Sequence, residues 1–255
     1  GALAELIYQP LNKDYPRLNL RELARVILLE AGSQLLSGID EGSYTAERLS
    51  KIGVDVRLDT KVASVEADRV ILADGKHIMA DTVLWAAGIQ GQPVVKSAGS
   101  ELTRGSQFEV LETLQSQKYP EMFVVGDLIR FVQDGKPLIN TAQVAMQSGE
   151  QAAENIMALI NNKPLENFRY YDKGMMATIG RNAAVANIGG RQFTGFFAWL
   201  IWLFIHLFFL IGFRNRIGVL TNWAWNYLFY ERVVRLVMPL DTAKESQSEL
   251  TYEPN

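Results

Sequence analysis

The feature that most constrains this chain is an apolar segment at Phe193–Phe213, which reads FTGFFAWLIWLFIHLFFLIGF. A helix of this length is long enough to cross the hydrocarbon core of a bilayer. However, His206 lies within the segment, and Trp199 and Trp202 lie near its middle third. A spanning helix keeps its tryptophans at the two membrane interfaces instead. We therefore expect this segment to dock at a membrane surface rather than to span the membrane.

The stretch Arg216–Val237 supports docking at a membrane surface. It mixes Trp and Tyr with the basic residues Arg216, Arg232 and Arg235. An aromatic and basic amphipathic helix suits the membrane interface, and its basic side chains are drawn to anionic lipid. The sequence therefore predicts a region of amphipathic membrane-anchoring helices at 191–240 and a disordered tail at 241–255. Alternatively, part of this region forms the buried core of a dimer interface.

Composition excludes several classes of protein. The chain has 255 residues, enough for one large or two small domains, and its net charge of −3 argues against a nucleic-acid binder. It has no cysteine, which excludes a disulfide framework and thiol chemistry, and two histidines, which exclude a His-rich metal site. The first residue is Gly1, and GALAEL has the pattern of the middle or end of a helix. We therefore expect the chain to begin inside a larger protein.

Strand and helix patterns alternate along the first part of the chain, which predicts a doubly wound α/β fold. The expected elements are a buried strand within Ala24–Gly32, an amphipathic helix at 41–52, a strand at Val54–Leu58, a hairpin turn at Asp74-Gly75 and a buried strand at Thr82–Trp85. Before them, a helix at Ala2–Ile7 is expected to end ahead of Pro10.

The second part predicts fewer elements. We expect a strand at Met122–Val125, a helix from about Thr141 to Asn161, and a final hairpin or short sheet within 168–190. Residues 91–118 are turn-rich and looser.

Two acidic residues follow expected strands, and each has a functional and a structural interpretation. Glu30 stands where dinucleotide-binding folds place an acid that accepts hydrogen bonds from the adenosine ribose. Asp127 follows Gly126, which permits close approach of a ligand, and its carboxylate could bind the hydroxyls of a polyol. Alternatively, Glu30 is a solvated acid at a strand end, and Asp127 caps a turn or helix.

The helix expected after Asn140 carries a second candidate site. Asn140 or Thr141 can cap it, and its first turn offers free N–H groups and a positive dipole end to an electron-rich oxygen. Ala142 leaves room for a flat ring. Gln143 and Gln147 stand four residues apart and therefore share a face. The structural alternative is an ordinary solvated face with two glutamines.

Together these segments resemble the type II NADH:quinone oxidoreductases, a family of flavoproteins with two dinucleotide-binding domains. The resemblance runs from Gly1 to about Leu240 and is carried by ILLEAG, TVLWAAGI, VVGD, AQVAMQ, DKGMMATIGRNAAV, LIGFRNR and NWAWNY. AQVAMQ fits the quinone-site pattern Ala-Gln-x-Ala-x-Gln of that family. The resemblance implies FAD/NAD(P)-binding Rossmann-like domains of the glutathione-reductase type, truncated at the N-terminus. Residues 1–92 would belong to the NADH-binding domain and 93–190 to the FAD-binding domain.

The resemblance also implies roles for individual residues. Asp127, with Gly126 beside it, would hold the ribityl chain of FAD, and Ala142 and Gln143 would face its isoalloxazine ring. The remaining residues divide into those near NADH, which are Glu30, Ala87, Gly88 and Ile89, and those lining a quinone pocket, which are Gln143, Gln147, Lys173 and Met176. Lys173 also has a rationale of its own, because a cation stabilises negative charge on reduced flavin or on a quinone oxygen. Its structural alternative is a solvated surface lysine.

The implied activity is electron transfer from NADH through FAD to a membrane quinone in the respiratory chain, without proton pumping. The implied protein is a homodimer bound peripherally, as a monotopic protein, to the cytoplasmic face of the bacterial inner membrane. The family's two glycine fingerprints, for FAD and for NADH, are expected to lie before Gly1. For that reason we do not expect this chain to turn over alone.

Two alternatives stay open. The first is another pyridine-nucleotide reductase of the same fold, such as a sulfide:quinone or a ferredoxin-type reductase. Sulfide chemistry needs redox cysteines, and this chain has none. The second is a non-catalytic, membrane-associated module that binds no flavin.

Overall fold

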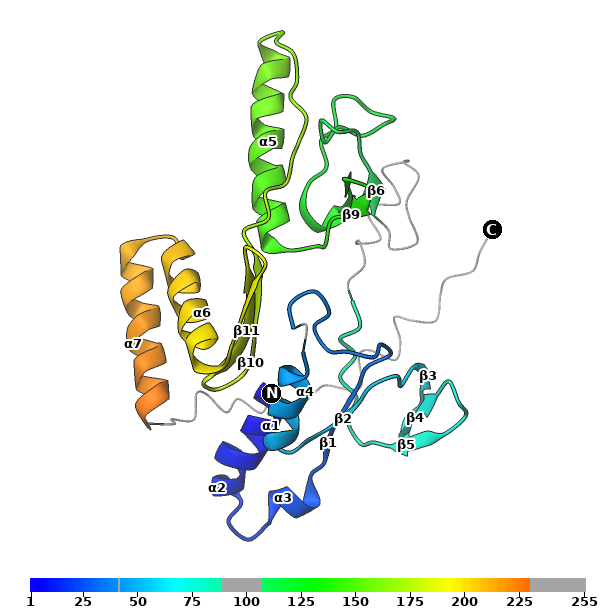
Figure 1. The fold of residues 1–255 in the computed structure, drawn as a ribbon, viewed down its shortest axis with the longest axis vertical. Coiled ribbons are helices and arrows are strands. Elements are labelled where there is room, and N and C mark those ends of the chain that lie inside the picture. The colour runs from blue at the N-terminus through cyan, green and yellow to red at the C-terminus, as the bar shows by residue number, and fades with distance from the viewer. Residues whose placement is uncertain (41, 89–106, 230–255) are drawn as a thin grey trace, which may run out of the picture.

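The structure is a computed structural model of the chain, and it describes residues 1–40, 42–88 and 107–229. Figure 1 shows three parts. The N-terminal part, from α1 to β5, lies at the bottom, and the part that contains α5 and β6–β9 lies at the top. Between them is a three-stranded sheet with the helices α6 and α7 on one side.

The chain begins with a continuous helical stretch. It consists of α1 (Ala2–Leu6), the π-helical η1 (Ile7–Leu11) and α2 (Asn12–Asp14). The prediction that the helix ends ahead of Pro10 is therefore wrong. A proline ring clashes with the carbonyl of the preceding turn in an α-helix, and the wider π turn at η1 relieves that clash. The short helix α3 (Leu20–Leu23) follows.

The expected strand–helix–strand unit is confirmed. β1 (Val26–Leu29) pairs in parallel with β2 (Val54–Arg57), and α4 (Tyr44–Lys51) connects them. Gly53 has a φ of 93° and ends the helix in the left-handed conformation that glycine tolerates. β1 is half-buried rather than fully buried, because β2 is its only partner among the described strands.

The hairpin at Asp74-Gly75 is also confirmed. Gly75 turns the chain between β4 (Arg69–Leu72) and β5 (His77–Met79), and β3 (Val62–Val65) completes this antiparallel sheet. The prediction of a buried strand at Thr82–Trp85 is wrong. No described strand pairs with this segment, so that Leu84 is 70% and Trp85 66% exposed.

The next part is built around one long helix. Its elements are β6 (Phe108–Glu109), the turn η3 (Gly126–Leu128), β7 (Ile129–Arg130), β8 (Val132–Gln133), β9 (Lys136–Pro137) and α5 (Ala142–Ile160). The helix expected from Thr141 is thus confirmed. The strand expected at Met122–Val125 is wrong, because only Phe123 forms a bridge, to Gln115, before the chain turns at η3.

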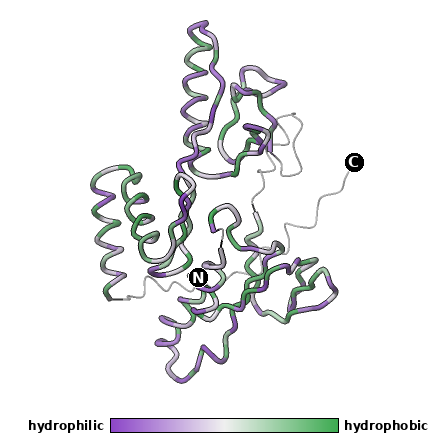
Figure 2. The backbone as a smooth tube through the Cα atoms, in the orientation of Figure 1, coloured by the Kyte–Doolittle hydropathy of each residue, from purple (hydrophilic) through white to green (hydrophobic). Residues whose placement is uncertain are grey.

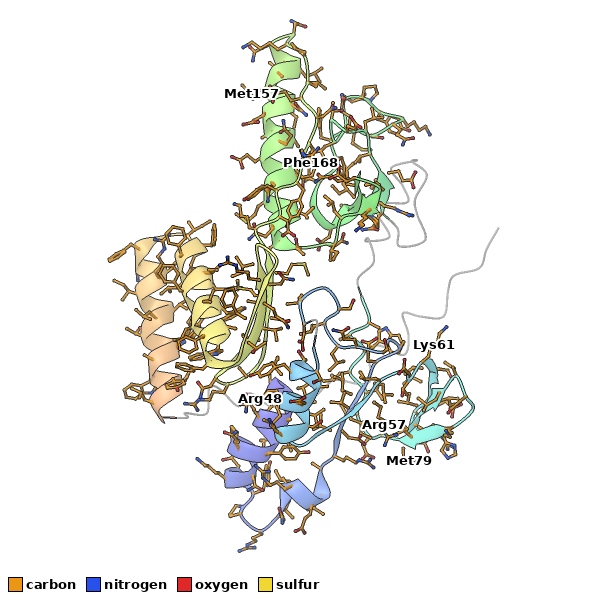
Figure 3. All side chains as sticks on the ribbon, in the orientation of Figure 1. Arg48, Arg57, Lys61, Met79, Met157 and Phe168 are labelled. Atoms are coloured by element: carbon orange, nitrogen blue, oxygen red, sulfur yellow. The ribbon has the colours of Figure 1, made fainter. Side chains whose placement is uncertain are left out.

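A buried aromatic contact holds this part together. The rings of Phe131 and Phe168 meet edge to face with 5.1 Å between their centroids. Figure 3 shows the labelled Phe168 beside α5, in the segment that returns from this helix toward the central sheet.

The central sheet confirms the expected hairpin and adds a strand to it. β10 (Met175–Gly180), β11 (Ala183–Ile188) and β12 (Arg191–Thr194) run antiparallel, and α6 (Gly195–Phe209) and α7 (Phe213–Phe229) follow. β11 is buried on both faces. Ala183 and Val185 pack into the core formed with α1 and α4, whereas Ala184 and Ala186 pack against α6 at Ala198. The alanine methyl groups permit this close approach of helix and sheet.

The helices α6 and α7 expose large apolar side chains. Phe197 is 75% and Phe204 is 70% exposed, and Figure 2 shows hydrophobic residues along α6. Within the described part of the chain, no helix combines the length and the apolar content that crossing a membrane requires. The end of the predicted stretch Arg216–Val237 and the tail 241–255 lie outside the described residues.

A buried carboxylate connects the N-terminal part to the central sheet. Asp40 is 1% exposed, and its oxygens accept hydrogen bonds from the Thr45 N–H at 2.7 Å, the Gly42 N–H at 3.1 Å and the Gln192 Nε2 at 2.9 Å. Burial alone would raise the pKa of Asp40, but these hydrogen bonds outweigh burial and lower the pKa overall.

We predict that Asp40→Asn lowers the free energy of unfolding by about 2 kcal/mol at neutral pH, because hydrogen bonds to a buried charge are lost. A carboxyl with a lowered pKa in the folded state stabilises fully above its unfolded pKa of about 3.9. That stabilisation is lost as the pH falls through the folded-state pKa. The difference between wild type and variant should therefore shrink below a pH of about 4 in urea titrations. A difference that stays constant with pH would contradict this prediction. The control is Asp81→Asn, which removes an exposed carboxylate that bonds to no described residue.

Candidate functional site

The turn η3 lies directly against the first turns of α5. The N–H of Gly126 donates to the Ser148 Oγ at 3.1 Å, and a Cβ on Gly126 would stand 3.4 Å from the Cβ of Ala145. Gly126 also has a φ of 69°, which favours glycine. The Gly126-Asp127 pair and the first turns of α5 therefore lie close together.

Asp127 has a fixed backbone and an open side chain. Its carbonyl accepts hydrogen bonds from the Gln107 Nε2 and the Asn140 Nδ2, each at 3.2 Å. Its carboxylate is exposed and makes no hydrogen bond or ion pair with any residue in the described ranges. An anchored main chain with an unpaired carboxylate is suited to binding hydroxyl groups of a ligand.

The start of α5 offers hydrogen-bond donors beside this carboxylate. Thr141 caps the helix, and its Oγ1 accepts from the Val144 N–H at 3.3 Å. The N–H groups of Ala142 and Gln143 have no acceptor within the part of the chain that the structure describes. Free N–H groups at the positive end of a helix attract electron-rich oxygens. Asn140, the other expected cap, holds the backbone of Asp127 instead.

The two predicted glutamines of α5 differ in their hydrogen bonding. The Gln147 Nε2 donates to the Tyr171 carbonyl, and its Oε1 accepts from the Tyr171 N–H, both at 3.0 Å. The amide of Gln143 bonds to no described residue. Gln147 therefore holds the main chain two residues before Lys173, and the amide of Gln143 remains open.

Sequence reasoning missed two further amides that bind the main chain in the same way. Gln133 bonds both the N–H and the carbonyl of Tyr170, at 2.8 and 3.1 Å, and Asn155 bonds both groups of Glu166, each at 2.9 Å. One signal could have revealed Asn155. Amide side chains recur every fourth residue along α5, at Gln143, Gln147, Gln151 and Asn155, and therefore follow one face of the helix.

Lys173 lies where the return segment meets the central sheet. It is exposed, forms no ion pair with a described residue, and places its Nζ 6.0 Å from the centroid of the Phe209 ring, near the end of α6. The next residue must be glycine, because Gly174 has a φ of 97° and a Cβ there would stand 2.4 Å from the Asn187 carbonyl oxygen.

Met176 lies on β10, half-buried against the core beneath α6 with Ala184 and Ala198.

Tyr170 lies near the α5 cap. Burial and the charge of Asp172 raise the pKa of Tyr170, so that its hydroxyl stays protonated.

The residues expected near NADH belong to the N-terminal part. Glu30 follows β1, and its Oε1 accepts from the Gly32 N–H at 2.7 Å. Ala87 and Gly88 are exposed and belong to no helix or strand, and Ile89 lies outside the described residues. β1 lies in the lower part of Figure 1, whereas α5 lies in the upper part.

Across the described ranges, no three His, Asp or Glu side chains are grouped so that they could hold a metal ion.

Two family models match this chain. The model described as pyridine nucleotide-disulphide oxidoreductase matches residues 17–149, and the model of the NDH2 C-terminal domain matches residues 172–231. The first match alone covers more than half of the chain. The second covers the end of the return segment, the central sheet and the helices α6 and α7.

Individual proteins similar to this chain, in sequence or in fold, belong to the same group as these family models. A type II NADH:quinone oxidoreductase of Mycobacterium tuberculosis is 36% identical over 245 residues, which are 91% of this chain and 52% of that protein. One of Haemophilus influenzae is 34% identical over 171 residues, which are 66% of this chain and 38% of that protein. The structure of NDH2 from Plasmodium falciparum in complex with NADH has the same fold, with a TM-score of 0.76 over 91% of this chain and 64% of that one, at 14% identity.

The chain spans about half the length of the Mycobacterium tuberculosis relative. The motifs that carry the resemblance, from ILLEAG to NWAWNY, fall within or beside the matched regions. The chain therefore belongs to the pyridine nucleotide-disulphide oxidoreductase family, and its resemblance to the type II NADH:quinone oxidoreductases is confirmed.

Proposed function

We propose that the protein carrying this chain is an FAD-dependent oxidoreductase that passes electrons from NADH to a membrane quinone, without pumping protons. One observation carries the proposal. The Asp127 carboxylate has no partner among the described residues, and the site also contains the free N–H groups of Ala142 and Gln143 at the start of α5. The similar proteins named as type II NADH:quinone oxidoreductases support it.

The residues at this site fit a flavin. The Asp127 carboxylate would accept hydrogen bonds from ribityl hydroxyls, and the close packing of Gly126 on Ala145 keeps bulky side chains away. The N–H groups of Ala142 and Gln143 would donate to the carbonyl edge of the ring, where the helix dipole stabilises negative charge. When bound, FAD supplies an acceptor for hydride from NADH and a donor of two electrons to quinone.

The remaining roles follow the chemistry of each side chain. The Glu30 Oε2, which bonds to no described residue, would accept from a ribose hydroxyl of NADH, with Ala87, Gly88 and Ile89 near the nicotinamide. The exposed Lys173 would stabilise negative charge on reduced flavin or on a quinone oxygen. Gln143, Gln147 and Met176 would line the quinone pocket with it.

A quinone with a long apolar tail stays in the bilayer, so that its pocket must open toward a membrane. Lys173 lies next to Phe209 of α6, which connects the proposed pocket to the exposed apolar helices. We therefore propose peripheral docking through α6 and α7 on the cytoplasmic face of a bacterial inner membrane, with the protein as a homodimer. In the domain division that we propose, residues 1–92 serve NADH, 93–190 serve FAD and quinone, and 191–240 serve the membrane.

The role of Asp127 predicts weaker flavin binding when its carboxylate is removed. In the full-length protein, Asp127→Ala should weaken FAD retention by about tenfold or more, since a hydrogen bond to a charged group contributes about 1.5–3 kcal/mol. The flavin absorbance that remains after gel filtration measures this. Glu121→Ala removes another exposed acid of the same part and should retain flavin. Unchanged flavin content in Asp127→Ala would contradict the assignment.

The role of Lys173 predicts a defect confined to one half-reaction. Lys173→Ala should slow reoxidation of the reduced flavin by menadione by about tenfold to a hundredfold, because a charge-stabilising group is lost. Reduction of the flavin by NADH should change by less than about twofold. Stopped-flow absorbance separates the two steps. Lys163→Ala, another exposed lysine, should behave as wild type, and equal loss of both steps in Lys173→Ala would overturn the assignment.

Membrane docking through α6 predicts that replacing its exposed phenylalanines weakens binding to lipid vesicles and leaves the stability of the fold unchanged. Phe197→Asp and Phe204→Asp should each weaken binding to phosphatidylglycerol vesicles by about tenfold, because a buried aromatic side chain contributes about 1.5–3 kcal/mol. Vesicle co-sedimentation measures the effect. Leu84→Asp, which has the same exposed fraction of 70% as Phe204 but lies in the N-terminal part, is the matched control. Equal losses in all three variants would contradict docking through α6.

A further inference from the structure

The segment that returns from α5 to the central sheet is held by side-chain amides instead of a neighbouring strand. Residues 163–174 form no helix or strand of their own, and Figure 1 shows them running alongside α5. Asn155, Gln133 and Gln147 each bond the N–H and the carbonyl of one residue in this segment. An uncharged amide can do this because it combines a donor and an acceptor.

Two of these amides fix consecutive residues. Gln133, from the β8–β9 hairpin, binds Tyr170, and Gln147, from α5, binds Tyr171. Both the N–H and the carbonyl of each tyrosine are therefore bonded, from two different elements. Lys173 follows two residues later, and its own side chain makes no ion pair with a described residue. The position of Lys173 consequently depends on how Tyr170 and Tyr171 are held.

The four-residue spacing along α5 indicates which amide stands level with Lys173. Asn155 meets the return segment at Glu166, and Gln147 meets it at Tyr171. The next amide toward the start of the helix is Gln143, roughly 6 Å further at 1.5 Å per helical residue. An extended chain covers that rise in about two residues, which leads from Tyr171 to Lys173.

From this arrangement we infer that Gln133 and Gln147 are positioning residues, which act through the backbone of Tyr170 and Tyr171 to hold Lys173 level with Gln143. Gln143, whose amide bonds to no described residue, is then the amide that meets the quinone. The inference rests on the proposed function. It assigns a role to Gln133, a residue outside the quinone-site motif, and it separates two glutamines that the motif treats alike.

The bonding of Gln147 favours this division. Its Oε1 and one of its N–H groups are already engaged with Tyr171, so that a quinone oxygen would have to compete with two hydrogen bonds of 3.0 Å. Gln143 faces no such competition within the described residues, and it lies in the first turn of α5, next to the free N–H groups.

The test uses glutamate in place of each positioning glutamine in the full-length protein. An ionised carboxylate accepts from the tyrosine N–H but repels the tyrosine carbonyl, whereas a protonated carboxyl both donates and accepts, as the amide does. Reoxidation of the reduced flavin by menadione should therefore be about tenfold slower than wild type in Gln133→Glu and Gln147→Glu at a pH of about 8. The ratio to wild type should begin to recover only as the pH falls to about 4, close to the ordinary pKa of a glutamate carboxyl. Gln133→Leu and Gln147→Leu should show no recovery.

The control is Asn155→Asp, which alters the same kind of bond at Glu166, far along the segment from Lys173. It should lower the thermal midpoint and leave the rate of flavin reoxidation unchanged. The inference is overturned if Gln133→Glu reoxidises its flavin like wild type at every pH. It is equally overturned if the two half-reactions fall together in proportion to stability. Wild-type protein that cannot pass electrons from NADH to menadione would instead refute the proposed function.

Discussion

The whole arrangement depends on β11 being buried on both faces. Ala183 and Val185 close the core of the N-terminal part, whereas Ala184 and Ala186 form the surface on which α6 lies. Alternate residues of β11 point to opposite faces of the sheet, and this one strand thus joins the N-terminal part to the C-terminal helices. A larger side chain at Ala184 or Ala186 would separate α6 from the sheet, because overpacking a filled interface forces the backbone to move. The C-terminal helices therefore keep a fixed relation to the N-terminal part through this strand.

Side-chain amides extend that order from the sheet to the site. β10 follows the return segment, and this segment is bonded by Gln133, Gln147 and Asn155 instead of a strand partner. At the other end of the site, the backbone of Asp127 is held in a similar manner by Asn140. Polar side chains thus fix the main chain around the site. Among the described residues, the Asp127 carboxylate and the Gln143 amide have no hydrogen-bond partner, and the Lys173 ammonium forms no ion pair. Such anchoring of the main chain around open groups is what an oriented cofactor and substrate require.

Much of the fold could be predicted from the sequence, but not all of it. Hydrophobic period and turn residues predicted β1, α4, the Asp74-Gly75 hairpin and α5, because each of these elements is set by local pattern and capping. Thr82–Trp85 and Met122–Val125 failed as strands because a strand needs a neighbour, and local pattern does not reveal whether one is present. In the candidate site, Asp127 and the start of α5 were predictable from a glycine, an acid and a cap. The hydrogen bonds of Gln133 to the main chain could not be predicted, because its partner Tyr170 lies 37 residues away in the sequence.

We propose that the protein carrying this chain moves electrons from NADH to quinone through a bound flavin. The most direct measurement is the absorbance spectrum of the purified, full-length wild-type protein in an anaerobic stopped-flow experiment, first mixed with NADH and then with menadione. We predict a flavin spectrum that bleaches with NADH and returns with menadione, at two electrons per flavin. A protein without flavin absorbance, or a reduced flavin that menadione leaves unchanged, would contradict the account.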